Sequence, residues 1–241
     1  MTLKPRPVHK VFTTRTGGVS AAPFDSFNLG DHVGDDPQAV AANRARLASI
    51  IGVSDFVWME QLHTNTVTVV DAPQIAPATD AVVTTQRGLA LAVLTADCVP
   101  LLLSDDRAGV IAAVHAGRLG ARNDILLRTL DTMESLGSKP ETTHVLLGAA
   151  ASGKRYEVPK EMADDFEATV PGSRTRTEQG TWGIDIRAGL VRQLLSRGVK
   201  NIDVNPHCTI KNEHYFSYRR EGKTGRQAGV IWLSHLLGKD Q

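Results

Sequence analysis

The apolar residues of the chain fall into short runs of strand length, separated by glycine, proline, asparagine and aspartate. Runs of this length between turn residues predict strands. The runs between residues 56 and 115 follow one another with no helical pattern among them, so hairpins must join them and the sheet is predicted to be mixed. The expected strands cover 8–15, 56–60, 66–70, 79–84, 89–95, 99–104, 110–115 and 144–149.

Helix start and stop signals lie on both sides of this strand-rich region. Asp36 and Pro37 supply a cap and a first helical residue, and Gly52 supplies a stop. The helices expected from such signals cover 37–51, 121–136, 159–168 and 186–197, while 16–36 is a long loop and 215–237 is predicted to form two strands around a glycine-rich turn. The fold class is therefore α/β (or α+β), with mixed β-sheets flanked by helices. No repeat or linker divides the sequence, so we expect one domain over residues 1–241.

Composition narrows the classes of function. The chain has 241 residues and a net charge of +1, which gives no electrostatic basis for binding nucleic acid or a membrane surface. Its apolar runs are far shorter than the roughly 18 residues of a membrane span, and no apolar segment follows the basic residues of 1–10 as it would in a secretory signal. Two cysteines suit a reducing cytoplasm.

An acid and a thiol interrupt the apolar run VLTADCVPLLL at 93–103. Alone, Cys98 would be a small buried hydrophobe. Asp97 needs hydrogen bonds or a cation if it is buried, and Pro100 cannot donate to a central ladder. The three residues together predict a break in the sheet where side chains converge.

Two histidines extend this candidate site. His115 ends the apolar strand GVIAAV before a glycine-containing turn, and His63 lies in the polar segment QLHTNTV. Each could be structural or exposed by itself. Together with Cys98 they suit zinc, which prefers imidazole and thiolate and keeps a fourth position open for water in catalytic sites. Without zinc, Cys98 and His115 could instead be a nucleophile and its base.

The sequence resembles the YfiH/laccase-domain family, also called multicopper polyphenol oxidase-like proteins. The matching segments are FTTRTGGVS, FNLGDHVGDDP, QLHTNTV, LTADCVPLLL, AAVHAGRLG and FSYRREGKTGRQAGVIWL. The resemblance implies that His63, Cys98 and His115 hold a metal. It further implies phosphorolysis of adenosine, inosine and methylthioadenosine, together with deamination of adenosine; the family's older name implies copper-dependent phenol oxidation.

Two segments depart from the family's form. Arg118-Leu119-Gly120 stands where the family has Trp-Arg-Gly, and 148–159 lacks the proline-containing GPAIGP pattern.

Phosphorolysis needs an anion site, and the sequence offers two. Backbone N–H groups from Gly117 to Gly120 open a helix next to His115, and Arg118 adds a fork of donors. The second candidate is a group of arginines around the turn EGKTG, where Tyr218 could stack on a base: Arg219, Arg220 and Arg226. For deamination, Asp97 is the candidate general acid or base, or it orients a metal-bound histidine.

The resemblance, together with the candidate zinc site, implies a zinc-dependent purine nucleoside phosphorylase with adenosine deaminase activity, whose partners are nucleosides and phosphate. The chain could form a homodimer. A copper-dependent polyphenol oxidase (Cu²⁺ in place of Zn²⁺) ranks lower, because eight histidines and two cysteines without an H-x-H pair cannot easily hold four copper ions. A cysteine hydrolase using Cys98 and His115 is a third hypothesis, and a non-enzymatic module is a fourth.

Overall fold

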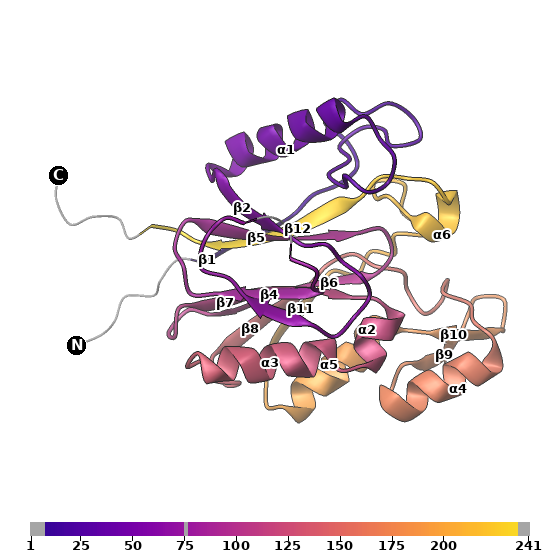
Figure 1. Cartoon of the computed structure of the whole chain (residues 1–241). Coiled ribbons are helices and arrows are strands. Elements are labelled where there is room, and N and C mark those ends of the chain that lie inside the picture. Colours follow the sequence, from indigo (N-terminus) through magenta and orange to yellow (C-terminus); the bar gives the residue numbers. More distant parts are fainter. Residues whose placement is uncertain (1–7, 75–76, 236–241) are drawn as a thin grey trace.

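The computed structural model describes residues 8–74 and 77–235. Two mixed β-sheets lie face to face, with α1 outside one sheet and α2 to α5 outside the other, as Figure 1 shows. The four-stranded sheet has the order β1 (Val8–Phe12), β12 (Gln227–Leu233), β5 (Leu89–Thr95) and β2 (Asp55–Trp58). The six-stranded sheet has the order β11 (Asn201–Val204), β8 (Thr143–Leu147), β6 (Val99–Asp105), β7 (Val110–Ala116), β4 (Ala81–Thr84) and β3 (Val67–Val69).

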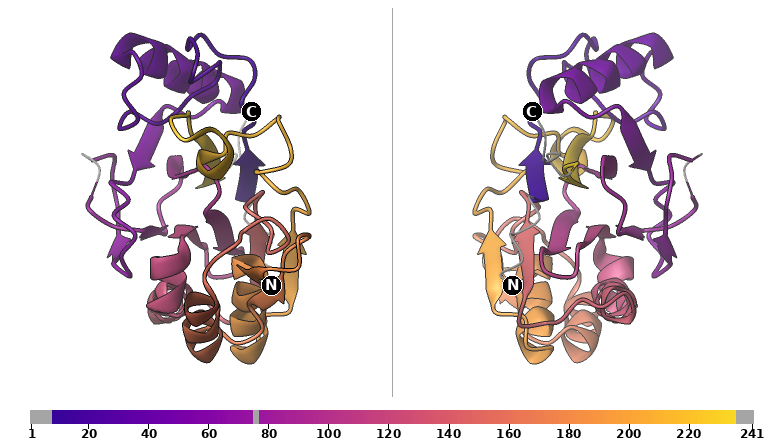
Figure 2. Two further views of the ribbon diagram at one scale, coloured as in Figure 1. Left: turned by 90° about the vertical axis from the view of Figure 1, so that its right-hand side faces the viewer. Right: turned by 90° about the vertical axis from the view of Figure 1, so that its left-hand side faces the viewer.

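The helices are α1 (Pro37–Ile51), α2 (Arg118–Arg122), α3 (Ile125–Ser135), α4 (Lys160–Thr169), α5 (Ile186–Ser196) and α6 (Tyr218–Glu221). A separate hairpin of β9 (Arg174–Arg176) and β10 (Trp182–Ile184) lies beside α4, and Figure 2 shows the layers from both ends. The predicted fold class, with mixed sheets flanked by helices, is confirmed. Within the described residues, no helix is long and apolar enough to cross a membrane.

The central strands β5, β6 and β7 are buried along their whole length and mostly apolar, because both of their faces are covered. In β5, Leu89, Leu91 and Val93 point into the core between the two sheets. The intervening Ala90, Ala92 and Leu94 pack under α1. A third cluster, on the other face of the six-stranded sheet, holds α3, α4 and α5. The two sheets are therefore locked together by side chains that alternate along each strand.

The signals for the first helix act as predicted. The Asp36 carboxylate accepts a hydrogen bond from the Gln38 N–H, Pro37 begins the helix, and Gly52 ends it in the left-handed conformation at φ 69°. The predicted helix over 121–136 was wrong in its start: the chain forms α2 and α3, separated where Asp124 takes φ 67°.

The prediction of two strands at the C-terminal end was also wrong. Within residues 215–235 only β12 is a strand, and Tyr218–Glu221 form the single turn of α6, capped by the Ser217 hydroxyl, which accepts from the Arg220 N–H. The hairpin of β9 and β10 and the edge strand β11 were not predicted, because they are short and largely polar or exposed. The segment 1–7 and positions 236–237 of the predicted C-terminal segment lie outside the described residues.

Glu221 fixes α6 to the first loop of the chain. Its carboxylate accepts hydrogen bonds from Arg15 Nη1 at 2.6 Å, from Thr224 Oγ1 at 2.6 Å and from Arg220 Nη2 at 3.1 Å. Burial raises the pKa of this carboxyl, but the bonds from Thr224, Arg15 and Arg220 outweigh that effect and lower the pKa to about 2. The ionised carboxylate therefore stabilises the folded state.

We expect Glu221→Gln to lower the free energy of unfolding by about 1 kcal/mol at pH 7, after discounting the shift for solvent screening. Because the folded pKa lies below the ordinary value, this stabilisation is complete above about pH 4.5 and is lost as the pH falls towards about 2. Urea denaturation of both proteins from pH 7 down to pH 3 measures the difference. A difference that stays constant over this range would contradict the assignment.

Candidate metal centre and adjoining pocket

Three side chains meet where the chain passes between or leaves the two sheets. His63 lies on the segment that leads from β2 in one sheet to β3 in the other. Cys98 lies at the turn between β5 and β6, which also belong to different sheets, and His115 lies near the end of β7. One donor atom from each of the three lies within 4.8 Å of the others. The predicted break between the strands is therefore a crossing from sheet to sheet, and it brings distant residues together.

A buried carboxylate positions both histidines. Asp80 is fully buried just before β4, and its Oδ1 lies 2.7 Å from His115 Nδ1. The same carboxylate accepts hydrogen bonds from the backbone N–H groups of Leu62, His63 and Thr64 at 3.2, 3.0 and 2.7 Å. The hydroxyl of Thr64 adds a further bond at 2.8 Å. Asp80 thus orients the His115 ring through Nδ1, which leaves Nε2 for a ligand, and holds the turn that carries His63.

The titratable groups of this cluster shift one another's pKa values. Burial lowers the pKa of His115, but Cys98 and the hydrogen bond to Asp80 outweigh it and raise that pKa to about 9. Burial raises the pKa of Asp80, whereas the hydrogen bonds from His115 and Thr64 lower it to about 2. Burial, His115 and the charge of Arg226 lower the pKa of His63. Asp80 is therefore an anion at neutral pH, and a metal at this site would displace a proton from His115.

The backbone leaves space at the cluster. His63 and Asp97 both have positive φ values, 58° and 105°, which side chains other than glycine adopt at a cost. Gly117 faces the cluster, where a Cβ atom would lie 2.6 Å from His63 Nδ1 and 3.0 Å from Cys98 Sγ. The lack of a side chain at Gly117 is therefore a condition for an ion to fit. Two imidazoles, one sulfur and this clearance suit Zn²⁺.

Asp97 has a different environment from Asp80. Its Oδ1 accepts from Thr209 Oγ1 at 2.6 Å, and its Oδ2 accepts from the Arg219 backbone N–H at 2.7 Å. The carboxylate therefore holds the segment around 209 and the start of α6 beside the cluster. One predicted role for Asp97 is to orient a metal-bound histidine; at His115 the carboxylate in contact with the ring is that of Asp80.

A pocket of about 470 Å³ opens beside Cys98, within the usual range for small-molecule sites. Arg118 and Arg219 give it two cationic groups, and Tyr218, with 62% of its surface exposed, gives it a free aromatic ring. The Arg219 guanidinium lies 4.8 Å from the centre of the Tyr156 ring. The full lining is Ala96, Asp97, Cys98, Arg118, Ala151, Tyr156, Ile186, Tyr218 and Arg219.

The remaining predicted anion-binding residues have distinct surroundings. Arg220 donates from Nη1 to the carbonyl oxygens of Thr209 and Ile210 and from Nη2 to that of Tyr215, so its guanidinium is committed to holding loops. Arg226 is partly buried, and the charges of Cys98 and Asp97 act on it.

Gly117 and Gly120 flank the start of α2. A Cβ at Gly120 would lie 3.0 Å from the Thr64 carbonyl oxygen, which explains the need for glycine. Because α2 has only five residues, its backbone N–H groups are a weak anion site, and the Arg118 side chain carries the positive charge.

The chain belongs to the family described as multi-copper polyphenol oxidoreductase laccase, which matches residues 9–234. A purine nucleoside phosphorylase of Corynebacterium glutamicum is 69% identical over 234 residues, covering 95% of each chain. A purine nucleoside phosphorylase of Mycobacterium tuberculosis is 55% identical over 230 residues, covering 94% of this chain and 92% of the relative.

Solved structures of the same fold agree with this membership. The crystal structure of a Neisseria meningitidis protein superposes with a TM-score of 0.87 at 34% identity, covering 96% of each chain. The crystal structure of the Bacillus licheniformis protein YfiH superposes with a TM-score of 0.88 at 30% identity, covering 94% of this chain and 93% of that one. The resemblance to the YfiH/laccase-domain family is therefore confirmed.

Proposed function

We propose that the chain is a zinc-dependent purine nucleoside phosphorylase that takes nucleosides and phosphate. The observation that carries the proposal is the convergence of His63, Cys98 and His115 beside a pocket with two arginines and an exposed tyrosine. The curated relatives named purine nucleoside phosphorylase, one of them 69% identical over nearly the whole chain, support it.

The donor set favours one zinc ion over several copper ions. Among residues 8–74 and 77–235, a single group of three His, Cys, Asp or Glu donors comes this close together. A multicopper oxidase needs several such sites, so the copper hypothesis has less support from the geometry. When bound, zinc supplies Lewis-acid chemistry and a water of lowered pKa. His63 is the exposed member of the set, so a reactant can approach from its side.

Different residues of the pocket would bind different parts of the substrates. Arg118 and Arg219 would bind the phosphate oxygens with their guanidinium forks, and Tyr218 would stack on the purine. In phosphorolysis a phosphate oxygen forms a bond to the anomeric carbon of the ribose as the bond to the base breaks. The arginines would hold the phosphate in line with that carbon and neutralise its charge.

We also propose that adenosine is deaminated at the same site. Hydrolytic deamination needs an activated water near the six-position carbon of adenine. Zinc held by the three donors would supply the chemistry that activates such a water. Both oxygens of Asp97 are hydrogen-bonded to Thr209 and Arg219, so its role there is to position the pocket wall.

The test is a nucleoside panel with and without phosphate, on the wild type and on His115→Ala, together with metal analysis of protein purified without added copper. Phosphate-dependent release of hypoxanthine from inosine and stoichiometric zinc are the expected results. No turnover of any nucleoside by zinc-loaded wild type would overturn the phosphorylase proposal. Ammonia release from adenosine without phosphate tests the deaminase separately.

Arg219 and Arg220 form a matched pair for testing the phosphate site. We expect Arg219→Ala to raise the KM for phosphate roughly tenfold or more, since one charged hydrogen-bonding group contributes about 1.5–3 kcal/mol. The Arg219 backbone bond to Asp97 remains in this variant. Arg220→Ala should instead lower the melting temperature, because it removes bonds to four backbone carbonyls, and leave the KM for phosphate nearly unchanged. Equal effects on KM would contradict the assignment.

One observation supports a second candidate, a cysteine hydrolase. Asp80, His115 and Cys98 lie in series, with a 2.7 Å contact from Asp80 to His115 and the Cys98 sulfur within 4.8 Å of a His115 ring nitrogen. This is the order of orienting acid, base and nucleophile in cysteine hydrolases. Activity on an ester or amide that survives a strong chelator and is abolished in Cys98→Ser would favour this candidate over the zinc enzyme.

A further inference from the structure

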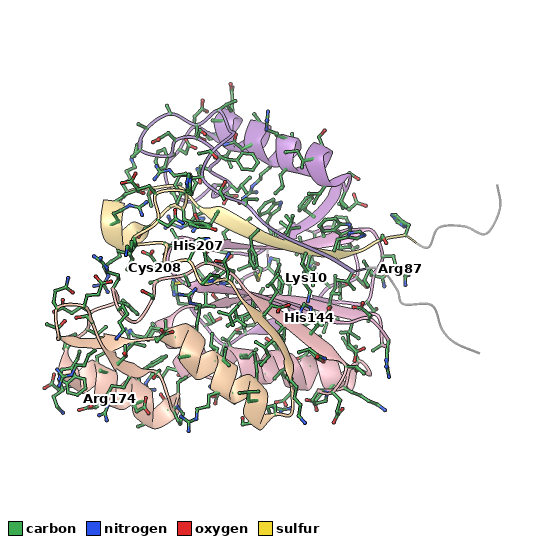
Figure 3. The ribbon with its side chains drawn as sticks, turned by 180° about the vertical axis from the view of Figure 1, so that it is seen from behind. Lys10, Arg87, His144, Arg174, His207 and Cys208 are labelled. Carbon is green, nitrogen blue, oxygen red and sulfur yellow. The ribbon has the colours of Figure 1, made fainter. Side chains whose placement is uncertain are left out.

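Three titratable side chains, Lys10, His144 and Asp203, form a hydrogen-bonded series, and Figure 3 labels Lys10 and His144. Lys10 lies on β1 of the four-stranded sheet, whereas His144 and Asp203 lie on β8 and β11 of the six-stranded sheet. Lys10 Nζ is 2.7 Å from His144 Nδ1, and His144 Nε2 is 2.8 Å from Asp203 Oδ2. The series therefore joins the two sheets and has an amine at one end and a carboxylate at the other.

The bonds define which atom donates at each contact. Asp203 accepts, so His144 carries its proton on Nε2, and its Nδ1 is free to accept from Lys10. Lys10 Nζ also donates to the His144 backbone carbonyl oxygen at 3.0 Å. A neutral amine has two N–H groups, and these two acceptors use both. The lone pair on Nζ is then left without a partner in the series and is directed away from it.

The surroundings of Lys10 increase the fraction of its amine that is neutral. Burial lowers the pKa of Lys10 to about 8, against the opposing charges of Asp106 and Asp203. At pH 7 roughly 10% of such amines are neutral, compared with less than about 0.1% for an ordinary lysine. A less basic nucleophile is intrinsically slower, as the corresponding trend in thiols shows, so the net gain in rate is on the order of tenfold.

We propose that Lys10 is a nucleophilic acyl acceptor, a modification site for small, uncharged acyl thioesters, with His144 as its base and Asp203 orienting His144. The nitrogen lone pair attacks the thioester carbonyl carbon, so an N–C bond forms and the C–S bond breaks. The amine proton passes to His144 Nδ1 and from there to the departing thiolate, which leaves as the thiol. Asp106 and Asp203 make the region anionic, which disfavours negatively charged acyl donors.

The experiment incubates the full chain with the S-acetyl thioester of N-acetylcysteamine and follows each lysine by mass spectrometry. The exposed Lys154 and Lys200 are internal references. At pH 7 we expect Lys10 to be acetylated about tenfold faster than either reference. The Lys10 rate should level off above about pH 8–9, whereas the reference rates continue to rise beyond pH 10. Equal rates at pH 7, or parallel pH profiles, would overturn the proposal.

The His144→Gln variant separates a base from a structural contact. Glutamine can still accept a hydrogen bond from Lys10, but it cannot take up a proton. The variant should lose most of the rate advantage, at least fivefold, and exposed-lysine rates should not change. A His144→Gln protein that acetylates Lys10 at the wild-type rate would overturn the role of His144. If this variant does not fold, the wild-type comparison across pH still decides whether Lys10 is the nucleophile.

Discussion

Asp80→Asn should lose metal affinity by roughly 10- to 100-fold, with a comparable fall in kcat/KM at limiting metal. The change keeps the shape of the side chain but removes the negative charge that faces His115 Nδ1 at 2.7 Å. It also removes an acceptor from the N–H groups that hold the turn at 62–64. Both histidines of the candidate metal site therefore lose their orientation at once. Competition titration against a chromogenic chelator measures the affinity.

Asp105 provides the matched control for this variant. It is also a buried aspartate, and its carboxylate accepts from Thr142, Ser138 and the backbone N–H groups of Lys139 and Ala108. Asp105→Asn should destabilise the fold by about as much as Asp80→Asn, on the order of 2–4 kcal/mol, but leave metal affinity unchanged. If both variants lose metal equally, Asp80 acts through general stability and the proposed orienting role is wrong.

Gly117→Ala should weaken metal binding at least tenfold while leaving the fold intact. The backbone of Gly117, with φ −77° and ψ 175°, accommodates alanine without strain. The added methyl carbon would lie 2.6 Å from His63 Nδ1 and 3.0 Å from Cys98 Sγ, inside the volume that the ligand atoms need. We expect at least a tenfold fall in bound metal and in turnover, with a change in unfolding free energy within about 1 kcal/mol.

Gly52→Ala should give the opposite result. Gly52 ends α1 in the left-handed region at φ 69°, and a Cβ there would meet no atom within 4 Å. Alanine would therefore cost about 1 kcal/mol of stability through backbone strain alone, with metal content and turnover unchanged. Full metal occupancy in Gly117→Ala would show that the cluster opens differently from the observed geometry.

Much of the architecture could be predicted from the sequence because its signals are local. Asp36, Pro37 and Gly52 define α1 by their own chemistry, and the apolar runs of β5, β6 and β7 are long enough to identify. The break between α2 and α3 depends on Asp124 adopting a left-handed conformation, which no sequence pattern required. The segment before α6 has aromatic residues that favour a strand, but the Ser217 cap and the loop contacts of Arg220 make a helical turn there instead.

In the candidate site, too, some residues could be predicted from the sequence and others could not. Residue chemistry suggested His63, Cys98 and His115, and the structure brings their donors together. Asp80 was missed because its partners lie in the turn at 62–64 and on β7, far along the chain. The available signal was an acid placed directly before the apolar run Ala81-Val82-Val83 of β4, where burial demands hydrogen-bond partners. Likewise, the partners of Asp97, Thr209 and Arg219, are more than a hundred residues away.

Two of the three donors lie on the connections that pass between the sheets, and the third lies on the six-stranded sheet. An ion held by all three would therefore tether one layer of the sandwich to the other. Binding at a hundredfold excess over Kd contributes about 2.7 kcal/mol to the state in which the layers are in register. By thermodynamic linkage, a substitution that destabilises the packing between the two sheets also lowers the affinity for the ion, even when the substituted residue lies far from the donors. Binding of the ion would therefore support both the proposed turnover of substrate and the stability of the packing between the two sheets.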